Sequence, residues 1–120
     1  MASGSIKDEA SVGVETEGEI VLVNVFTPKD GQVDAFVEAQ TAEYERLRGS
    51  VPGWRGNTLY RSLDGTTAVN VARFASQADY RAWRDSDVFA GHMERIAPLV
   101  ETAAPGLYRE VYDAAPEAGD

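Results

Sequence analysis

Two asparagines interrupt apolar stretches of the chain and are the residues most informative about chemistry. Asn24 lies in the run of residues 20–27, and Asn70 lies in the run of residues 66–74. Alternation along each stretch places both amides on the same face of two adjacent strands. A buried amide without a hydrogen bond costs about 1–3 kcal/mol, so the pair predicts a polar spot in a cavity. The alternative is that the backbone or a buried water satisfies each amide.

Small and aromatic residues predict the shape of that cavity. Ala68 and Ala72 flank Asn70 and leave volume above the sheet, and Phe26 shares the face of Asn24. Four further rings would cover this volume: Phe74, Tyr80, Trp83 and Phe89. Ordinary core packing is the alternative for these rings, since aromatic residues dominate protein cores. Tyr80 and Trp83 carry a polar atom, which favours a role at the cavity for these two.

His92 is the only histidine of the chain. It lies on an apolar helical stripe with Val88, Phe89 and Ile96, where a histidine is commonly a satisfied core residue. No second histidine, cysteine or carboxylate stands at ligand spacing, so no metal site is predicted. A general base and a single axial haem ligand remain open as functional interpretations.

The sequence lacks the common catalytic motifs. It has no glycine-rich phosphate loop, nucleophile elbow or zinc motif. Chemistry would then depend on hydrogen bonds, a shaped cavity and one proton relay. Oxidation by O2 of a substrate that is electron-rich once deprotonated meets these limits. For such a substrate the protein need only stabilise a phenolate or enolate and exclude water.

Apolar periodicity predicts the elements that position these residues. Strands are expected at residues 20–27, 54–62 and 66–74, with a hairpin turn at Asp64-Gly65, and at 107–113 after a loop at 103–106. One helix is expected between an N-cap at Asp30 and a C-cap at Gly49, and another from Ser76 to Pro98 with a break at Ser86. Charged residues off the stripe of the first helix are expected on a solvated face: Glu38, Glu43, Glu45, Arg46 and Arg48.

This order of elements predicts an α+β, ferredoxin-like βαββαβ fold over residues 19–113, with flexible tails at 1–18 and 114–120. The first and third strands would be central, and two helices would cover one sheet face. Valines of both strands, with Tyr108 and Tyr112, would make the other face apolar. Such a patch is large for a monomer, so we expect a homodimer with sheets packed face to face, a dimeric α+β barrel.

Composition excludes several classes of partner. The net charge is −9, from 20 acidic and 11 basic side chains, which argues against binding nucleic acid or an anionic membrane surface. No apolar run approaches the ~20 residues of a membrane span, and residues 1–18 lack the apolar segment of a signal peptide. Cysteine is absent, which suits a reducing compartment. We therefore expect a cytoplasmic protein.

Residues 20–112 resemble the antibiotic biosynthesis monooxygenase superfamily, and most closely its polyketide-tailoring anthrone oxygenases. The resemblance rests on VNVFTPKDG and on VPGWRGNTLYRSLDGTTAVNVARFASQADYRAW, above all on the pattern from Ser62 to Tyr80. It implies the dimeric ferredoxin-like fold. It also implies a cofactor-independent monooxygenase that oxidises an anthrone, polycyclic phenol or hydroquinone with O2 in aromatic polyketide biosynthesis.

The resemblance also implies roles for particular residues. Asn70 matches an asparagine that binds substrate oxygens, and Tyr80 matches a tyrosine proposed to transfer protons. Phe74 stands where the anthrone oxygenases carry a tryptophan, so an indole N–H donor is missing here. Arg95 is an approximate match for an arginine of the second helix.

Two alternatives stay open. Haem-degrading monooxygenases of the same superfamily use an asparagine of the first strand and a tryptophan and a histidine of the second helix, which Asn24, Trp83 and His92 match. The other alternative is a non-catalytic dimer of the same fold that binds a small molecule. The predicted site comprises Asn70, Tyr80, Trp83 and His92 as catalytic residues, and Asn24, Phe26, Ala72, Phe74, Phe89 and Arg95 as substrate-binding residues.

Overall fold

A computed structural model describes residues 18–116. Its elements, in chain order, are β1 (Ile20–Pro28), α2 (Val33–Leu47), β2 (Trp54–Arg61), β3 (Ala68–Phe74), α3 (Gln77–Arg84), α4 (Asp87–Ile96), the 3-10 turn η1 (Ala97–Leu99) and β4 (Val100–Tyr108). The chain thus has the α+β, ferredoxin-like βαββαβ fold, with the second helical segment divided into α3 and α4. The predicted tails lie largely outside the described residues, and the boundaries of the 19–113 domain stay a prediction.

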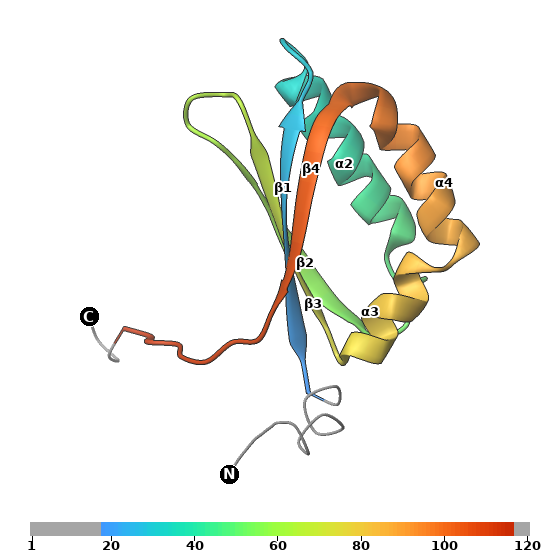
Figure 1. Ribbon diagram of the computed structural model, residues 1–120, viewed down its shortest axis with the longest axis vertical. Helices are drawn as coiled ribbons and strands as arrows, with labels where there is room; N and C mark the ends of the chain where they lie inside the picture. Colours follow the sequence, from blue (N-terminus) through green and yellow to red (C-terminus); the bar gives the residue numbers. More distant parts are fainter. Residues whose placement is uncertain (1–17, 117–120) are drawn as a thin grey trace.

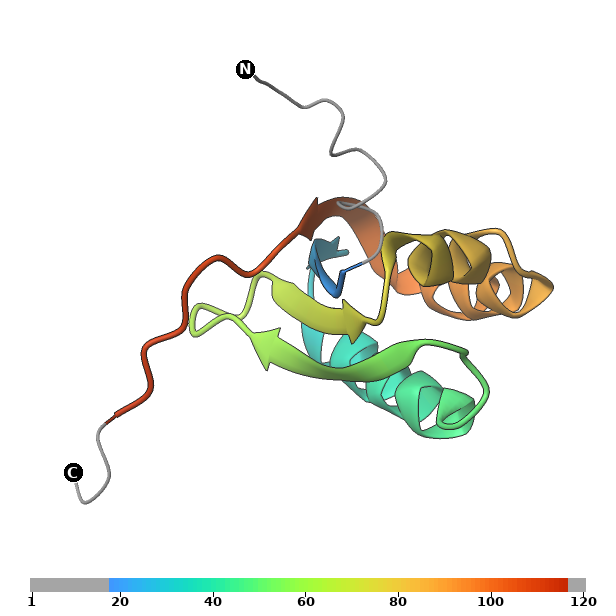
Figure 2. The same cartoon turned by 90° about the horizontal axis from the view of Figure 1, so that it is seen from below.

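The four strands form one antiparallel sheet in the order β2-β3-β1-β4. The first and third strands are central, as predicted. All helices pack on one face of this sheet (Figures 1 and 2), and within residues 18–116 no helix covers the other face. The structure therefore has two layers, and any enclosed site must lie between them.

The core between the layers is divided into two clusters. One contains Ile20, Leu22, Ala72, Phe74 and Tyr80. The other contains Phe26, Phe36, Ala68 and Ile96. The strand alternation explains the division, because Asn24 lies two residues from Leu22 and from Phe26, and it pairs in register with Asn70 on β3. The two asparagines thus lie side by side where the apolar core is interrupted.

The second helical segment is positioned by two serine caps. The Ser76 hydroxyl accepts a hydrogen bond from the backbone N–H of Asp79 at the start of α3. The Ser86 hydroxyl accepts one from Phe89 at the start of α4. Both caps were predicted from the sequence, and they mark where the helices that carry Tyr80, Trp83 and His92 begin.

The first helix differs from its prediction at both ends. Its N-cap is Gln32, which makes no side-chain cap bond, so the expected cap at Asp30 is wrong. Gly31 has φ +74°, which is not a helical conformation, so the helix begins only after it, at Val33. At the other end the C-cap is Arg48, one residue before the expected Gly49, and Gly49 follows it with φ +79°.

The last strand begins and ends earlier than the predicted range of 107–113. Residues 103–106, expected to be a loop, belong to β4 and pair with residues 23–26 of β1. Pro105 is tolerated there because β4 is an edge strand, where a missing N–H can face outward. Tyr112 therefore lies outside the sheet, and it is 81% exposed.

The uncovered face of the sheet is apolar; we call it the open face. It carries Val21, Val23 and Val25 of β1 with Val69 and Val71 of β3, and their partners Tyr60 and Tyr108 extend it across β2 and β4. Val25, Tyr60 and Tyr108 are exposed. Beyond β4, residues 111–116 extend away from the sheet (Figure 1). No helix among residues 18–116 is long and apolar enough to cross a membrane.

Candidate active site

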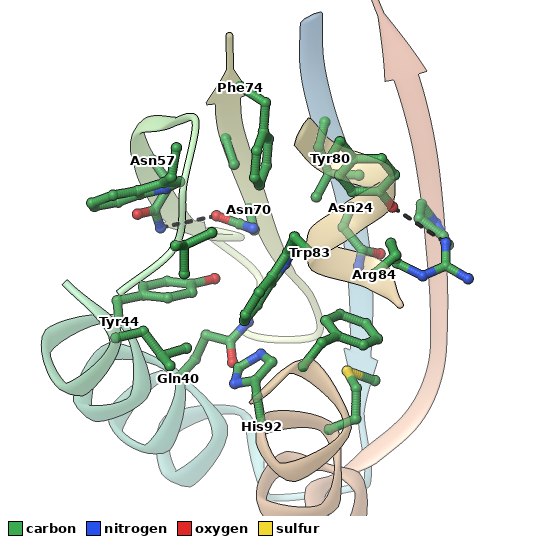
Figure 3. Close-up of a pocket in the computed structure, with 18 of the residues that line it drawn as sticks. Asn24, Gln40, Tyr44, Asn57, Asn70, Phe74, Tyr80, Trp83, Arg84 and His92 are labelled. Carbon is green, nitrogen blue, oxygen red and sulfur yellow. Dashed lines mark hydrogen bonds between the residues drawn. The ribbon is translucent and has the colours of Figure 1, made fainter. Parts of the chain in front are cut away.

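A cavity of about 310 Å³ lies between the sheet and the helices, where the two core clusters separate. Figure 3 shows labelled side chains from β1, β2, β3 and the helices α2, α3 and α4 around it. Its lining residues are Leu22, Asn24, Phe26, Gln40, Tyr44, Leu47, Val51, Trp54, Asn57, Asn70, Ala72, Phe74, Tyr80, Trp83, Arg84, Phe89, His92, Met93, Ala103 and Pro105. The volume lies at the lower end of the ~300–1,000 Å³ range of small-molecule sites.

The floor of the cavity presents one amide in a fixed orientation. Asn57 Nδ2 donates a hydrogen bond of 3.1 Å to Oδ1 of Asn70 (Figure 3). Since the Asn70 oxygen is engaged, its Nδ2 is left as a donor toward the cavity. Asn70 is 8% exposed, so this donor lies in a largely water-excluded place.

Asn57 was not predicted from the sequence, and a β-bulge explains why. Trp54 and Asn57 both line the cavity although they are three residues apart, whereas regular alternation would place them on opposite faces. The pairing of β2 with β3 shifts register between these two residues, and Gly56 within the bulge has φ +109°. The glycine in WRGN was the available signal.

Three polar atoms at the cavity are buried and have no hydrogen-bond partner among the described residues: Asn24 Oδ1, Gln40 Oε1 and the Tyr44 hydroxyl. Leaving such groups unsatisfied costs about 1–3 kcal/mol each. Burial also raises the pKa of the Tyr44 phenol, so this hydroxyl stays protonated and can donate. The three atoms are suited to a ligand that carries several hydroxyl or carbonyl groups.

Aromatic rings form the walls. Trp83 meets Phe89 edge to face at a centroid distance of 5.3 Å, and Phe74 meets Tyr80 in the same way at 5.4 Å. The Tyr80 hydroxyl accepts a hydrogen bond of 3.4 Å from Arg84 Nη1, which leaves its own proton free for a ligand (Figure 3). Such walls favour a flat, aromatic ligand.

His92 reaches the cavity from α4 and is held from behind by a carboxylate. Its Nδ1 lies 3.1 Å from Oε1 of Glu43 on α2. Glu43 also accepts hydrogen bonds of 2.8 Å from Arg46 and from Arg95. The expectation that Glu43 lies on a solvated face is therefore wrong: it is 7% exposed, because α4 packs on this part of α2.

These contacts set the charge of both groups. Hydrogen bonds from Arg46, Arg95 and His92 outweigh burial and lower the pKa of the Glu43 carboxyl from 4.5 to about 2. Burial lowers the pKa of His92 below its ordinary 6.5, although Glu43 opposes this shift. At neutral pH the site thus holds a neutral imidazole against an ionised carboxylate.

Nine of the ten predicted site residues line the one cavity: Asn24, Phe26, Asn70, Ala72, Phe74, Tyr80, Trp83, Phe89 and His92. Arg95 does not, because its guanidinium is bound to Glu43. The sequence did not reveal the roles of Gln40, Tyr44, Asn57 and Arg84 at the cavity. Residues 18–116 contain no group of three His, Cys, Asp or Glu side chains that could hold a metal ion.

Several solved structures share this fold. SnoaB, a cofactor-independent oxygenase from Streptomyces nogalater, is 24% identical with a TM-score of 0.64, over 83% of this chain and 99% of SnoaB. Rv0793 from Mycobacterium tuberculosis is 20% identical with a TM-score of 0.68, over 82% and 100%. Protein SO0527 from Shewanella oneidensis is 23% identical with a TM-score of 0.66, over 77% and 90%.

Comparison of the sequence with protein families identifies the family of this chain. No curated protein sequence is significantly similar to this chain. Residues 19–95 match the antibiotic biosynthesis monooxygenase family. This match spans more than half of the chain, from the start of β1 through α4, and includes both central strands and most of the cavity. The chain therefore belongs to the antibiotic biosynthesis monooxygenase family.

Proposed function

We propose that the protein is a cofactor-independent monooxygenase that oxidises an anthrone, polycyclic phenol or hydroquinone with O2, in the biosynthesis of an aromatic polyketide. The observation that carries this proposal is the Asn70 amide, which Asn57 orients toward an aromatic-walled cavity. Family membership supports oxygenase chemistry. SnoaB, a cofactor-independent oxygenase, shares the fold, which is consistent with the absence of a cofactor requirement.

The proposed reaction converts an anthrone-type CH2 into a carbonyl. The substrate loses a proton, and the resulting enolate, or phenolate, is electron-rich enough to reduce O2. A carbon–oxygen bond forms, giving a peroxide, and the O–O bond then breaks with loss of water. One atom of O2 enters the product and the other leaves as water, so the substrate supplies all the electrons and no further reductant is needed.

The residues of the cavity supply what this reaction requires. An amide N–H aimed at a developing oxyanion in a water-excluded site stabilises it strongly, and Asn70 Nδ2 offers such a donor. The hydroxyls of Tyr80 and Tyr44 can donate to other oxygens of the substrate, and the amide oxygens of Asn24 and Gln40 can accept from its hydroxyl groups. Trp83, Phe89 and Phe74 hold its rings and exclude water.

Haem fits this cavity poorly. Asn24, Trp83 and His92 do line the same space, but about 310 Å³ suits two or three fused rings better than a macrocycle of four pyrroles. Haem also carries two propionates, and Arg84 is the sole arginine or lysine among the described lining residues. We therefore do not propose haem degradation.

We also propose that two chains form a homodimer through their open faces. The valines of the two central strands, with Tyr60 and Tyr108, make a continuous apolar surface over all four strands. A surface of this kind is characteristic of protein interfaces. Pairing two sheets face to face would bury it and produce the dimeric α+β barrel.

Turnover of model substrates tests the function. Purified protein, treated with a metal chelator, is mixed with dithranol and a panel of anthrones and polycyclic hydroquinones, and quinone formation is followed by absorbance. The proposal predicts a rate above the spontaneous one for at least one of them. Spontaneous rates throughout, together with tight binding of the same compounds, would favour the non-catalytic binding dimer.

A further inference from the structure

The contact between Glu43 and His92 has no part in the steps described above: His92 borders the cavity, whereas Glu43 lies behind the imidazole and is not among the described residues that line the cavity. A carboxylate in this position is costly to bury unless it is paired. It is held here by His92, Arg46 and Arg95, which come from two helices. The ionised carboxylate of Glu43 therefore lies against Nδ1 of His92.

The geometry determines which nitrogen of His92 carries the proton. Glu43 is ionised and can only accept a hydrogen bond, so Nδ1 must donate across the 3.1 Å contact. A neutral imidazole has one N–H, and Nε2 is then left with its lone pair. Within residues 18–116 no hydrogen bond engages Nε2, and the ring borders the cavity.

We propose that Glu43 is a positioning residue that fixes His92 in the Nδ1–H form, so that Nε2 takes the proton whose loss activates the substrate toward O2. This inference rests on the proposed function and assigns it a base. In the step, the hydroxyl or C–H bond of the substrate breaks, its electron pair stays on the substrate, and the proton becomes bonded to Nε2. Glu43 then stabilises the imidazolium across the same contact.

The charged and titratable groups around the ring favour this role. Glu43 and Arg46 face it from α2, Arg95 lies on its own helix α4, and Arg84 and Tyr44 line the cavity from α3 and α2. Burial keeps the pKa of His92 below 6.5 and so keeps the base free at neutral pH. The carboxylate of Glu43 keeps that pKa from falling further, which preserves the basicity that proton transfer requires.

The first test is NMR of the untagged protein, because a chain with 1 histidine gives a single imidazole signal. Nitrogen-15 shifts distinguish the two neutral forms. We expect the Nδ1–H form in the wild type and a titration midpoint below 6.5. In Glu43→Gln the midpoint should move to lower pH, because the negative charge that favours the imidazolium is gone. The exposed ion pair of Glu45 with Arg48 on the same helix provides the control variant Glu45→Gln, which should change neither property.

The second test separates positioning from folding. Glu43→Met fills a similar volume but cannot accept a hydrogen bond, so His92 is no longer held in the Nδ1–H form. We expect kcat to fall about 100-fold, the lower end of the contribution of general acid–base catalysis, with KM nearly unchanged. In Glu43→Gln the acidic limb of kcat/KM should move to lower pH, a change that a purely structural role would not produce. The melting temperature of each variant shows whether it is folded.

An Nε2–H form in the wild type, or a folded Glu43→Met variant with wild-type kcat, would overturn the inference. The NMR measurement needs no substrate, so it decides the state of His92 even if no anthrone is oxidised. A protein that shows the Nδ1–H form but oxidises no substrate would contradict the proposed function and, with it, the assignment of Nε2 as its base.

Discussion

Asn57 Nδ2 donates a hydrogen bond of 3.1 Å to Oδ1 of Asn70, and this contact orients the amide that faces the cavity. The bond joins a bulged residue of an edge strand to the centre of the sheet. Its consequence is that Asn70 presents N–H rather than C=O to a ligand. A site built to stabilise a developing oxyanion needs this orientation.

Removing the amide of Asn70 should lower activity more than removing the amide of Asn57. Asn70→Ala deletes the donor itself, so we expect kcat to fall about 100- to 1,000-fold. Asn57→Ala removes only the bond that orients Asn70, and a neutral hydrogen bond of about 1 kcal/mol corresponds to a loss of roughly fivefold. Thr58→Ala, on the opposite face of the same strand, is the control. Equal activity in Asn70→Ala and wild type would contradict the role of Asn70.

Hemin titration tests whether the cavity binds haem, the alternative ligand. Because the cavity is small and has one arginine at its lining, we expect hemin to keep the Soret spectrum of the free compound in the presence of the protein. A Soret shift that disappears in His92→Ala would show that haem binds at this site and would revive haem degradation as the function.

The oligomeric state depends on the open face. Light scattering on the eluting peak should give twice the 13.0 kDa of one chain. Val25→Asp places a charge within the open face, where Val25 is 37% exposed, and should give monomers because an interface cannot bury an unpaired charge cheaply. Val88→Asp, at a 43% exposed valine of α4, should remain dimeric. A wild-type monomer would contradict the proposed dimer.

Stability should fall in acid because of Glu43 and His92. The carboxyl has a pKa of about 2 in the folded protein and 4.5 as its ordinary value, so its stabilising contribution is complete above pH 4.5 and is lost as the pH falls toward 2. The lowered pKa of His92 acts in the same direction below about pH 6.5, since the unfolded chain binds its proton more readily.

Urea unfolding at a series of pH values from 7 to 3 measures this dependence. The free energy of unfolding of Glu43→Gln should be lower than that of the wild type at neutral pH and should decline less between pH 5 and pH 3. Parallel curves for the two proteins would mean that Glu43 titrates alike in the folded and unfolded states.

The sequence predicted the parts of the site that follow strand alternation and helix capping. Asn24 and Asn70 lie on one face because period-2 alternation holds through both central strands, and Ser76 and Ser86 cap their helices as expected. The same alternation failed at Asn57, because a bulge inserts an extra residue into β2 and shifts the residues that follow it to the other face.

Contacts between segments that are distant in the sequence also could not be predicted from local patterns. Glu43 resembles the neighbouring exposed carboxylates of α2, and its burial depends on His92 and Arg95, 49 and 52 residues further along the chain. The position of β4 likewise depends on pairing with β1, which overrides the poor strand propensity of Ala103, Ala104 and Pro105.

The central claim is oxidation by O2 without a cofactor, and oxygen consumption in the presence of a substrate measures it most directly. Metal-free protein in chelated buffer, supplied with 18O2 and an anthrone, should consume one O2 per quinone formed and place one 18O atom in the new carbonyl. The rate should exceed that of the buffer and of Asn70→Ala. Oxygen uptake equal to the spontaneous rate for every anthrone, phenol and hydroquinone supplied would contradict the account.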